Sequence, residues 1–222
     1  MKKIYVIIPA FNEGEVIASV IKNIKKNAFN NIIVVDDGSG DFTSEVAKKE
    51  GAIVLRHIIN RGKGAAIKTG IEAAKILKAD AVVTFDADGQ HSPKDIKKMI
   101  KKINESYDAV LGCRNFNIKE MPFLRIVANH MGNLITWFFY GIKVRDSQCG
   151  LRAYSKKAIF YMDTVNDRYE YDSEVIREIS KHKLKFTEVP VSVNYTKYSI
   201  SKKQKQSFSN SIKMVFKMFA TS

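Results

Sequence analysis

Short apolar runs alternate with amphipathic segments through the first 115 residues, and no other feature constrains the fold of this chain as strongly. The apolar runs have the length of buried strands, and the segments between them repeat apolar residues at helical spacing. Such an alternation is typical of an α/β domain that has a mostly parallel sheet with helices on both faces. The expected strands are 4–9, 31–36, 52–57, 80–85 and 108–113, and the expected helices are 14–27, 43–50, 63–77 and 93–104.

The pattern changes after residue 115. The apolar stretch 122–140 contains polar interruptions and fits either a core helix or a helix at a membrane interface. We expect a strand at 148–154, a helix at 171–182 and an edge strand at 185–195, where Pro190 cannot donate to a neighbouring strand. An apolar stripe flanked by lysines predicts a basic amphipathic helix near the C-terminus, formed by Phe208, Ile212, Val215, Phe216 and Phe219. The expected organisation is therefore a main domain over 1–195 and a basic amphipathic segment over 196–222.

The composition is that of a globular domain. Of the 222 residues, 45% are hydrophobic, which suffices for a sizeable core. No run approaches the roughly 18 apolar residues of a membrane span, so we expect no transmembrane helix. Cys113 and Cys149 are too few for a disulfide framework or a zinc site, and they fit a reducing cytosol.

The net charge of +14 is unevenly distributed, because the residues from Lys181 onward contribute +8 of it. A basic block of this kind suggests an anionic partner, either a membrane surface, a nucleic acid or a phosphorylated substrate. A solvated lysine-rich surface is the alternative interpretation.

Polar clusters follow three of the expected strands. Their members are Asn12 and Glu13, Asp36 and Asp37, and Asp86 and Asp88. Because the carboxyl ends of parallel strands lie along one edge of the sheet, we expect the three clusters to converge there. The alternative is that each cluster only caps a separate turn or helix.

The last of these clusters has the chemistry of a metal site. The carboxylates of Asp86 and Asp88, with the amide oxygen of Gln90, provide hard oxygen ligands. Such ligands suit Mg²⁺ or Mn²⁺ carrying a phosphate group.

The common nucleotide-binding motifs are absent. No Gly-x-Gly-x-x-Gly follows the first strand, and the run from Arg61 to Gly64 lacks the remainder of a P-loop. This run nevertheless opens an expected helix with two glycines and the cations of Arg61 and Lys63, which suits a phosphate group. A glycine-rich turn with solvated charges explains the same residues equally well.

Five segments taken in order resemble the family 2 glycosyltransferases of GT-A fold, and most closely the polyprenyl-phosphate (dolichyl-phosphate) mannosyl- and glucosyltransferases. The resemblance covers essentially residues 4–195. The segments are Pro9-Ala-Phe-Asn-Glu13, Asp36-Asp-Gly-Ser39, Asn60-Arg-Gly-Lys-Gly64, Asp86-Ala-Asp-Gly-Gln-His91 and Gly112-Cys-Arg114.

The resemblance implies a set of donor-side residues. The base and ribose of a nucleotide-sugar would contact Pro9, Phe11, Glu13 and Asp37. The Mg²⁺ or Mn²⁺ ion that bridges the donor diphosphate would be held by Asp86, Asp88 and Gln90. Arg61 and Lys63 would add to the stabilisation of the leaving diphosphate.

The resemblance also implies an acceptor side. Arg114 would bind phosphate, and the run from Asp146 to Arg152 resembles a later acceptor-side motif. Arg152 would bind an anionic group there, with a surface salt bridge as the alternative.

The implied reaction is the transfer of a hexose, with inversion, from a GDP- or UDP-sugar to a polyprenyl or dolichyl phosphate. A phosphate acceptor is already anionic and needs no general base, whereas a sugar hydroxyl acceptor in polysaccharide or glycan synthesis would need one. Asp172 is the candidate base, beside Glu170 and Glu174 at the start of a helix. Favourable charge at a helix N-terminus is the alternative role for these carboxylates.

The basic amphipathic segment suits the anionic cytoplasmic face of a membrane, so we expect a cytoplasmic, peripherally bound enzyme. The same stripe would equally allow the helix to pack on the domain. A nucleic-acid-binding protein is less favoured, because acidic residues such as Asp36 and Asp86 would repel phosphates at the binding edge. A nucleotidyltransferase is also less favoured, because it would usually carry a glycine-rich basic loop where this chain has Asn12 and Glu13.

Overall fold

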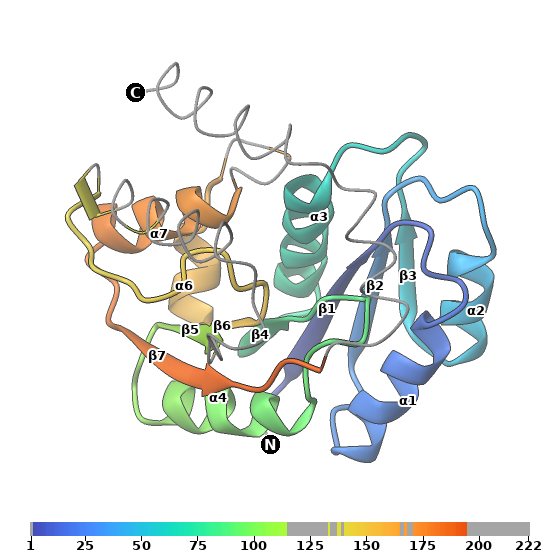
Figure 1. Ribbon diagram of the computed structural model, residues 1–222, viewed down its shortest axis with the longest axis horizontal. Coiled ribbons are helices and arrows are strands. Elements are labelled where there is room, and N and C mark those ends of the chain that lie inside the picture. The colour runs from blue at the N-terminus through green and yellow to red at the C-terminus, as the bar shows by residue number, and fades with distance from the viewer. Residues whose placement is uncertain are drawn as a thin grey trace.

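The computed structural model of the chain describes residues 2–114, 133, 137–138, 140–164, 167 and 171–194. These residues form a 7-stranded sheet with the strand order β3-β2-β1-β4-β6-β5-β7 (Figure 1). The strands are β1 (Ile4–Ala10), β2 (Ile32–Asp36), β3 (Ile53–Arg56), β4 (Ala81–Thr84), β5 (Ala109–Arg114), β6 (Arg152–Ser155) and β7 (Phe186–Val191). The helices are α1 (Ile17–Lys26), α2 (Thr43–Lys49), α3 (Lys63–Ile76), α4 (Lys94–Asn104), α6 (Lys156–Tyr161) and α7 (Tyr171–Lys181).

The sheet is mostly parallel, as the alternation of elements predicts. The neighbours β3, β2, β1 and β4 all run in one direction, and β7 runs parallel to β5. Only β6 is antiparallel among the described strands, and it lies between β4 and β5. The edge position of β7 confirms the prediction from Pro190, which lies within this strand.

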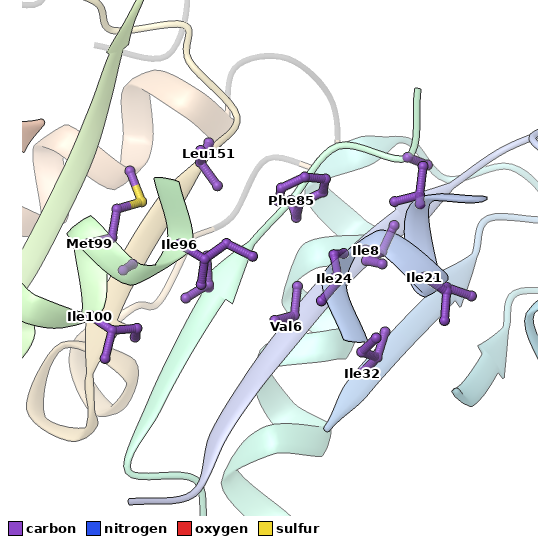
Figure 2. Packing of buried hydrophobic residues seen from close by; sticks show 14 of the residues in the cluster. Val6, Ile8, Ile21, Ile24, Ile32, Phe85, Ile96, Met99, Ile100 and Leu151 are labelled. Atoms are coloured by element: carbon purple, nitrogen blue, oxygen red, sulfur yellow. The ribbon is translucent and has the colours of Figure 1, made fainter. Parts of the chain in front are cut away.

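Helices cover both faces of the sheet because successive side chains of each strand point to opposite faces. Val6 and Ile8 of β1 belong to a buried cluster with α1, α2 and α4, part of which Figure 2 shows. Ile7 belongs to a second buried cluster with α3, α6 and α7 on the other face. Gly70 lets α3 lie close to β1, because a Cβ at this position would collide with the side chain of Ile7. This close packing brings the first residue of α3, Lys63, to the carboxyl edge of the sheet.

One predicted strand was too long, and one helix was not predicted. The strand expected at 148–154 begins only at Arg152, because the carbonyls of Ser147 and Cys149 accept hydrogen bonds from the Arg152 guanidinium. The sequence pattern also did not predict α6, whose first turn is capped by the Ser155 hydroxyl, which accepts a hydrogen bond from the Ala158 backbone N–H.

The C-terminal segment 196–222 lies outside the described residues, as does most of the apolar stretch 122–140. Among the helices that the structure describes, none combines the length and the apolar character needed to cross a membrane.

Candidate active site

The three polar clusters converge at one edge of the sheet, as expected from their positions after strands. The strands β2, β1 and β4 are parallel neighbours, and Ala10 pairs with Asp36 while Ile7 pairs with Thr84. The residues that follow these strands therefore lie side by side along the carboxyl edge. This arrangement makes the edge the candidate active site.

Asp86 forms an ion pair at the centre of this edge. Its Oδ1 atom lies 2.6 Å from Lys63 Nζ, and its Oδ2 atom lies 3.4 Å from His91 Nε2. Burial raises the pKa of Asp86, but the nearby Lys63 and His91 outweigh this effect, so the net pKa lies well below its usual value. For Lys63, burial lowers the pKa, yet Asp86 and then Asp172 raise it overall. Both members of the pair are therefore charged at neutral pH.

Gly150 forms the wall behind this ion pair. A Cβ added to Gly150 would lie 2.5 Å from Lys63 Nζ and 2.5 Å from Asp86 Oδ2, so a side chain there would require one of these charged groups to move. The Gly150 carbonyl accepts a hydrogen bond of 2.7 Å from Thr84 Oγ1, which fixes the segment against β4. The segment before β6 thus lies directly against the Lys63–Asp86 ion pair.

Asp88 lies in the turn that follows Asp86. Its Oδ1 atom accepts a hydrogen bond of 3.0 Å from the Gln90 backbone N–H, and Gly89 between them has φ +72°. Asp88 is partly exposed, whereas the Gln90 side chain is buried. The Gln90 carbonyl accepts a hydrogen bond from the Asn194 backbone N–H, so the segment that follows the edge strand β7 also holds the turn.

The donor set at this turn fits a metal that arrives with a diphosphate. Within the described residues, no three His, Cys, Asp or Glu side chains form a preformed metal cage. Asp86 and Asp88 nevertheless provide two carboxylates, and Mg²⁺ commonly binds through one or two carboxylates together with substrate phosphates. Gln90 would add an amide oxygen of the same hard character.

Asp37 holds the turn that leads to Lys63. Its carboxylate accepts hydrogen bonds from the backbone N–H groups of Arg61 at 2.9 Å and Gly62 at 2.7 Å. His57 Nδ1 lies 2.7 Å from the same carboxylate. The buried Asp37 carboxylate therefore positions the turn before α3. Its contact with a base stays a prediction. His57 was not singled out from the sequence as a partner of Asp37.

The segment after β1 carries the other donor-side residues. Pro9 lies within β1 and pairs with Val35, while Phe11, 41% exposed, follows the strand end. Glu13 is buried, and its backbone N–H donates to Thr43 Oγ1 at 2.9 Å. Contact of Phe11 with a base stays a prediction.

Arg114, at the end of β5, is held by a residue that sequence reasoning did not single out. Its Nε and Nη2 atoms lie 2.6 and 2.8 Å from the two carboxylate oxygens of Asp146, which is fully buried. The Arg114 backbone N–H also donates to Asp146 Oδ2. Asp146 opens the acceptor-side run, and its position as the only acid of that run was the available signal.

Arg152 is buried, with 2% of its surface exposed, so the alternative of a surface salt bridge is wrong. Its guanidinium donates to the carbonyls of Cys149, Ser147 and Asp172. It also lies 3.2 Å from the Asp172 carboxylate. Burial raises the pKa of Asp172 above its usual value, although Arg152 and Lys63 oppose the shift. Whether Arg152 contacts an acceptor stays a prediction.

Arg61 lies at the outer side of the edge, half exposed, with Nη2 3.3 Å from the Asp167 carboxylate. Lys68 of α3 contacts the same carboxylate at 3.1 Å. Arg61 and Lys63 therefore pair with different carboxylates, those of Asp167 and Asp86. Of the other helix-start carboxylates, Glu174 lies buried in the first turn of α7, and Glu170 lies outside the described residues.

Residues 5–160 match the family model described as glycosyl transferase family 2. The chain belongs to glycosyltransferase family 2. This glycosyltransferase is 48% identical to an uncharacterised protein of Methanocaldococcus jannaschii, over 90% of this chain and 85% of that protein. It is 41% identical to the UDP-N-acetylglucosamine–dolichyl-phosphate N-acetylglucosaminyltransferase of Methanococcus voltae, over 90% and 89% of the two chains.

Solved structures show the same fold. The glycosyltransferase superposes on glucosyl-3-phosphoglycerate synthase from Mycobacterium tuberculosis with a TM-score of 0.71 at 19% identity, over 90% of this chain and 74% of that one. The expected GT-A fold is thereby confirmed.

Proposed function

We propose that this glycosyltransferase moves a hexose or N-acetylhexosamine from a nucleotide-diphosphate sugar to a polyprenyl phosphate. The observation that carries the proposal is the 41% identity to the Methanococcus voltae enzyme, which extends along nearly the full length of both chains. Other relatives are named polyprenol monophosphomannose synthase, from Mycolicibacterium smegmatis, and dolichyl-phosphate beta-glucosyltransferase, from Homo sapiens. UDP-N-acetylglucosamine is therefore the first donor to test, ahead of GDP-sugars.

The donor diphosphate would lie against the carboxyl edge between the Asp88 turn and the start of α3. A Mg²⁺ or Mn²⁺ ion held by Asp88 with Asp86 and Gln90 would neutralise charge on the leaving diphosphate. A related structure contains Mn²⁺ and uridine diphosphate, which supports this role. Lys63 and Arg61 place two further cations beside the N-terminus of α3, where backbone N–H groups also favour an anion.

The acceptor side would be formed by the segment before β6. Arg114 and Arg152 are fixed by buried carboxylates, so their charges are held in place before any ligand arrives. A phosphate oxygen of the acceptor would attack the anomeric carbon opposite the leaving diphosphate, which inverts that carbon. Because this oxygen is already anionic, no protein group has to remove a proton.

A second candidate is transfer to a sugar hydroxyl, and the specific observation that favours it is the buried Asp172 carboxylate. A raised pKa makes a carboxylate a stronger base, as proton removal from a hydroxyl requires. We prefer a lipid phosphate as the acceptor because the Methanococcus voltae enzyme, named for a dolichyl-phosphate acceptor, matches this chain over 90% of its length. A lipid acceptor and the +14 charge together support peripheral binding at the cytoplasmic membrane face, through the basic segment 196–222.

The test is a screen of UDP- and GDP-sugars against polyprenyl phosphate, with lipid-linked sugar detected by mass. We expect transfer from UDP-N-acetylglucosamine, and loss of at least about a hundredfold in rate for Asp88→Asn with the fold intact. Asp163→Asn, at an exposed position, is the matched control. Donor hydrolysis without a lipid product would refute the lipid acceptor, and full activity of Asp88→Asn would refute the metal assignment.

A further inference from the structure

The connection from β3 to α3 presents two isoleucines to solvent. Ile58 is 99% exposed, the highest value for any large hydrophobic side chain among the described residues, and Ile59 is 69% exposed. Figure 1 shows this connection at the upper right of the coloured part of the chain, beyond the carboxyl end of β3. Burying one isoleucine stabilises a protein by about 1.5–3 kcal/mol, so two adjacent exposed isoleucines would gain free energy if another surface covered them.

The backbone around the two isoleucines is fixed, so their exposure is part of the folded structure. On one side, the His57 backbone N–H donates to the Asp36 carbonyl and the His57 ring contacts Asp37. On the other side, the Arg61 backbone N–H donates to the same Asp37 carboxylate. Beneath the turn, a Cβ on Gly38 would lie 2.7 Å from the Ile59 carbonyl carbon, so only glycine permits this close approach.

Cations flank the exposed pair. The side chains of Arg56 and Arg61 are 49% and 51% exposed, and they lie on either side of Ile58 and Ile59 in the sequence. Apolar side chains flanked by arginines and lysines are typical of segments that enter the interface of an anionic bilayer.

We infer that the β3–α3 turn inserts Ile58 and Ile59 into the headgroup region of an anionic lipid bilayer. This inference rests on the proposed function, because a polyprenyl-phosphate acceptor would present its phosphate at the same surface. Lys63 at the start of α3 follows the turn directly, so the inserted turn would bring the donor site to the membrane.

The charges of the chain favour an anionic bilayer, and not the chain's own basic segment 196–222, as the partner of Ile58 and Ile59. Residues 196–222 contain six lysines and no acidic residue, so the rest of the chain, whose net charge is +14 less 6, or +8, would repel them. Arg56 and Arg61 contact Asp36 and Asp167 but stay half exposed, and together with the net positive charge of the chain they attract an anionic lipid surface.

The experiment measures co-sedimentation of the full chain with vesicles of equimolar phosphatidylcholine and phosphatidylglycerol. The test variant is Ile58→Ser combined with Ile59→Ser, which we expect to bind these vesicles at least about tenfold more weakly than the wild type. The matched control is Ile76→Ser, because Ile76 is 80% exposed but lies at the end of α3, about 20 Å from its first residue. We expect Ile76→Ser to bind like the wild type.

Several outcomes would overturn the inference. These are wild-type protein that does not sediment, a test variant that binds like the wild type, or a control variant that loses as much binding as the test variant. Loss of self-association in light scattering, without loss of vesicle binding, would instead assign the two isoleucines to a second copy of the chain.

Activity separates this inference from the proposed function. We expect the test variant to retain transfer to a short, water-soluble polyprenyl phosphate and to lose transfer to a long acceptor embedded in the vesicles. If the wild type binds vesicles through Ile58 and Ile59 but transfers sugar to neither acceptor, the membrane contact stands and the proposed function fails.

Discussion

Replacing Gly150 by alanine is expected to displace the ion pair at the centre of the site. The new Cβ would lie 2.5 Å from Lys63 Nζ and 2.5 and 2.6 Å from the two carboxylate oxygens of Asp86. Non-bonded heavy atoms are most stable about 3.5 Å or more apart, so at least one charged group must move by roughly 1 Å. The backbone of residue 150 cannot easily move away, because its carbonyl is bonded to Thr84 Oγ1.

The magnitude follows from the crowding. Forcing an extra methyl group into a filled space costs about 1–3 kcal/mol of unfolding free energy. For a chain of this length, each kcal/mol lowers Tm by about 2–4 °C. Lys63 and Asp86 are 26% and 25% exposed, so Lys63 can swing towards solvent and the cost should lie in the lower half of that range. Under the proposed function these charges lie beside the donor diphosphate, so Gly150→Ala should also weaken the binding of a UDP-sugar.

A double-mutant cycle in urea unfolding tests this reasoning. In a Lys63→Ala background the space taken by Nζ becomes empty, so Gly150→Ala should cost less there, by about 0.5 kcal/mol or more. Gly40→Ala is the control, because a Cβ at Gly40 meets no atom within 4 Å, and it should change stability by less than about 0.5 kcal/mol. Equal costs of Gly150→Ala in both backgrounds would refute the proposed contact.

Three further expectations can be measured. Arg114→Ala should lower the unfolding free energy by about 3 kcal/mol or more in urea titrations, since it leaves the buried Asp146 charge without its bidentate partner; a loss below about 1 kcal/mol would contradict this. Burial raises the pKa of the Cys149 thiol to about 12, so alkylation of Cys149 at pH 8 should be about a thousandfold slower than for an ordinary thiol, as measured by mass spectrometry of the labelled peptide. Because Lys63 helps to hold the pKa of Asp86 below its unfolded value, their pair stabilises the fold above about pH 4, and this contribution is lost as the pH falls towards the lowered pKa. Acid unfolding of Lys63→Met should therefore show a weaker pH dependence than the wild type, and identical pH profiles would contradict the assignment.

Much of the fold could be predicted because hydrophobic periodicity is a local property. The expected strands and helices of the first 115 residues all occur, with ends shifted by up to three residues. The prediction failed at 148–151, where the Arg152 guanidinium donates to the carbonyl of Cys149 and to that of Ser147 just before the segment. Hydrophobic periodicity does not show that an arginine side chain folds back onto the backbone that precedes it.

The position of the site could also be predicted, but its internal pairing could not. Three polar clusters after three strands indicated one edge, and the parallel order of β2, β1 and β4 places them there. No periodicity indicated that Lys63 would neutralise Asp86, that Asp146 would hold Arg114, or which glycine would line the pair. Each of these contacts joins residues that are far apart in the sequence.

The sequence by itself determined the alternation of elements, and with it the edge at which the acidic clusters meet, because strand and helix periodicity are written in consecutive residues. Only the tertiary structure decided which charges are paired. Asp37 accepts hydrogen bonds from the turn before α3, and the buried Arg152 pairs with Asp172. The physical reason is that a buried charge needs a partner, and which partner lies within reach depends on the packing of the whole sheet.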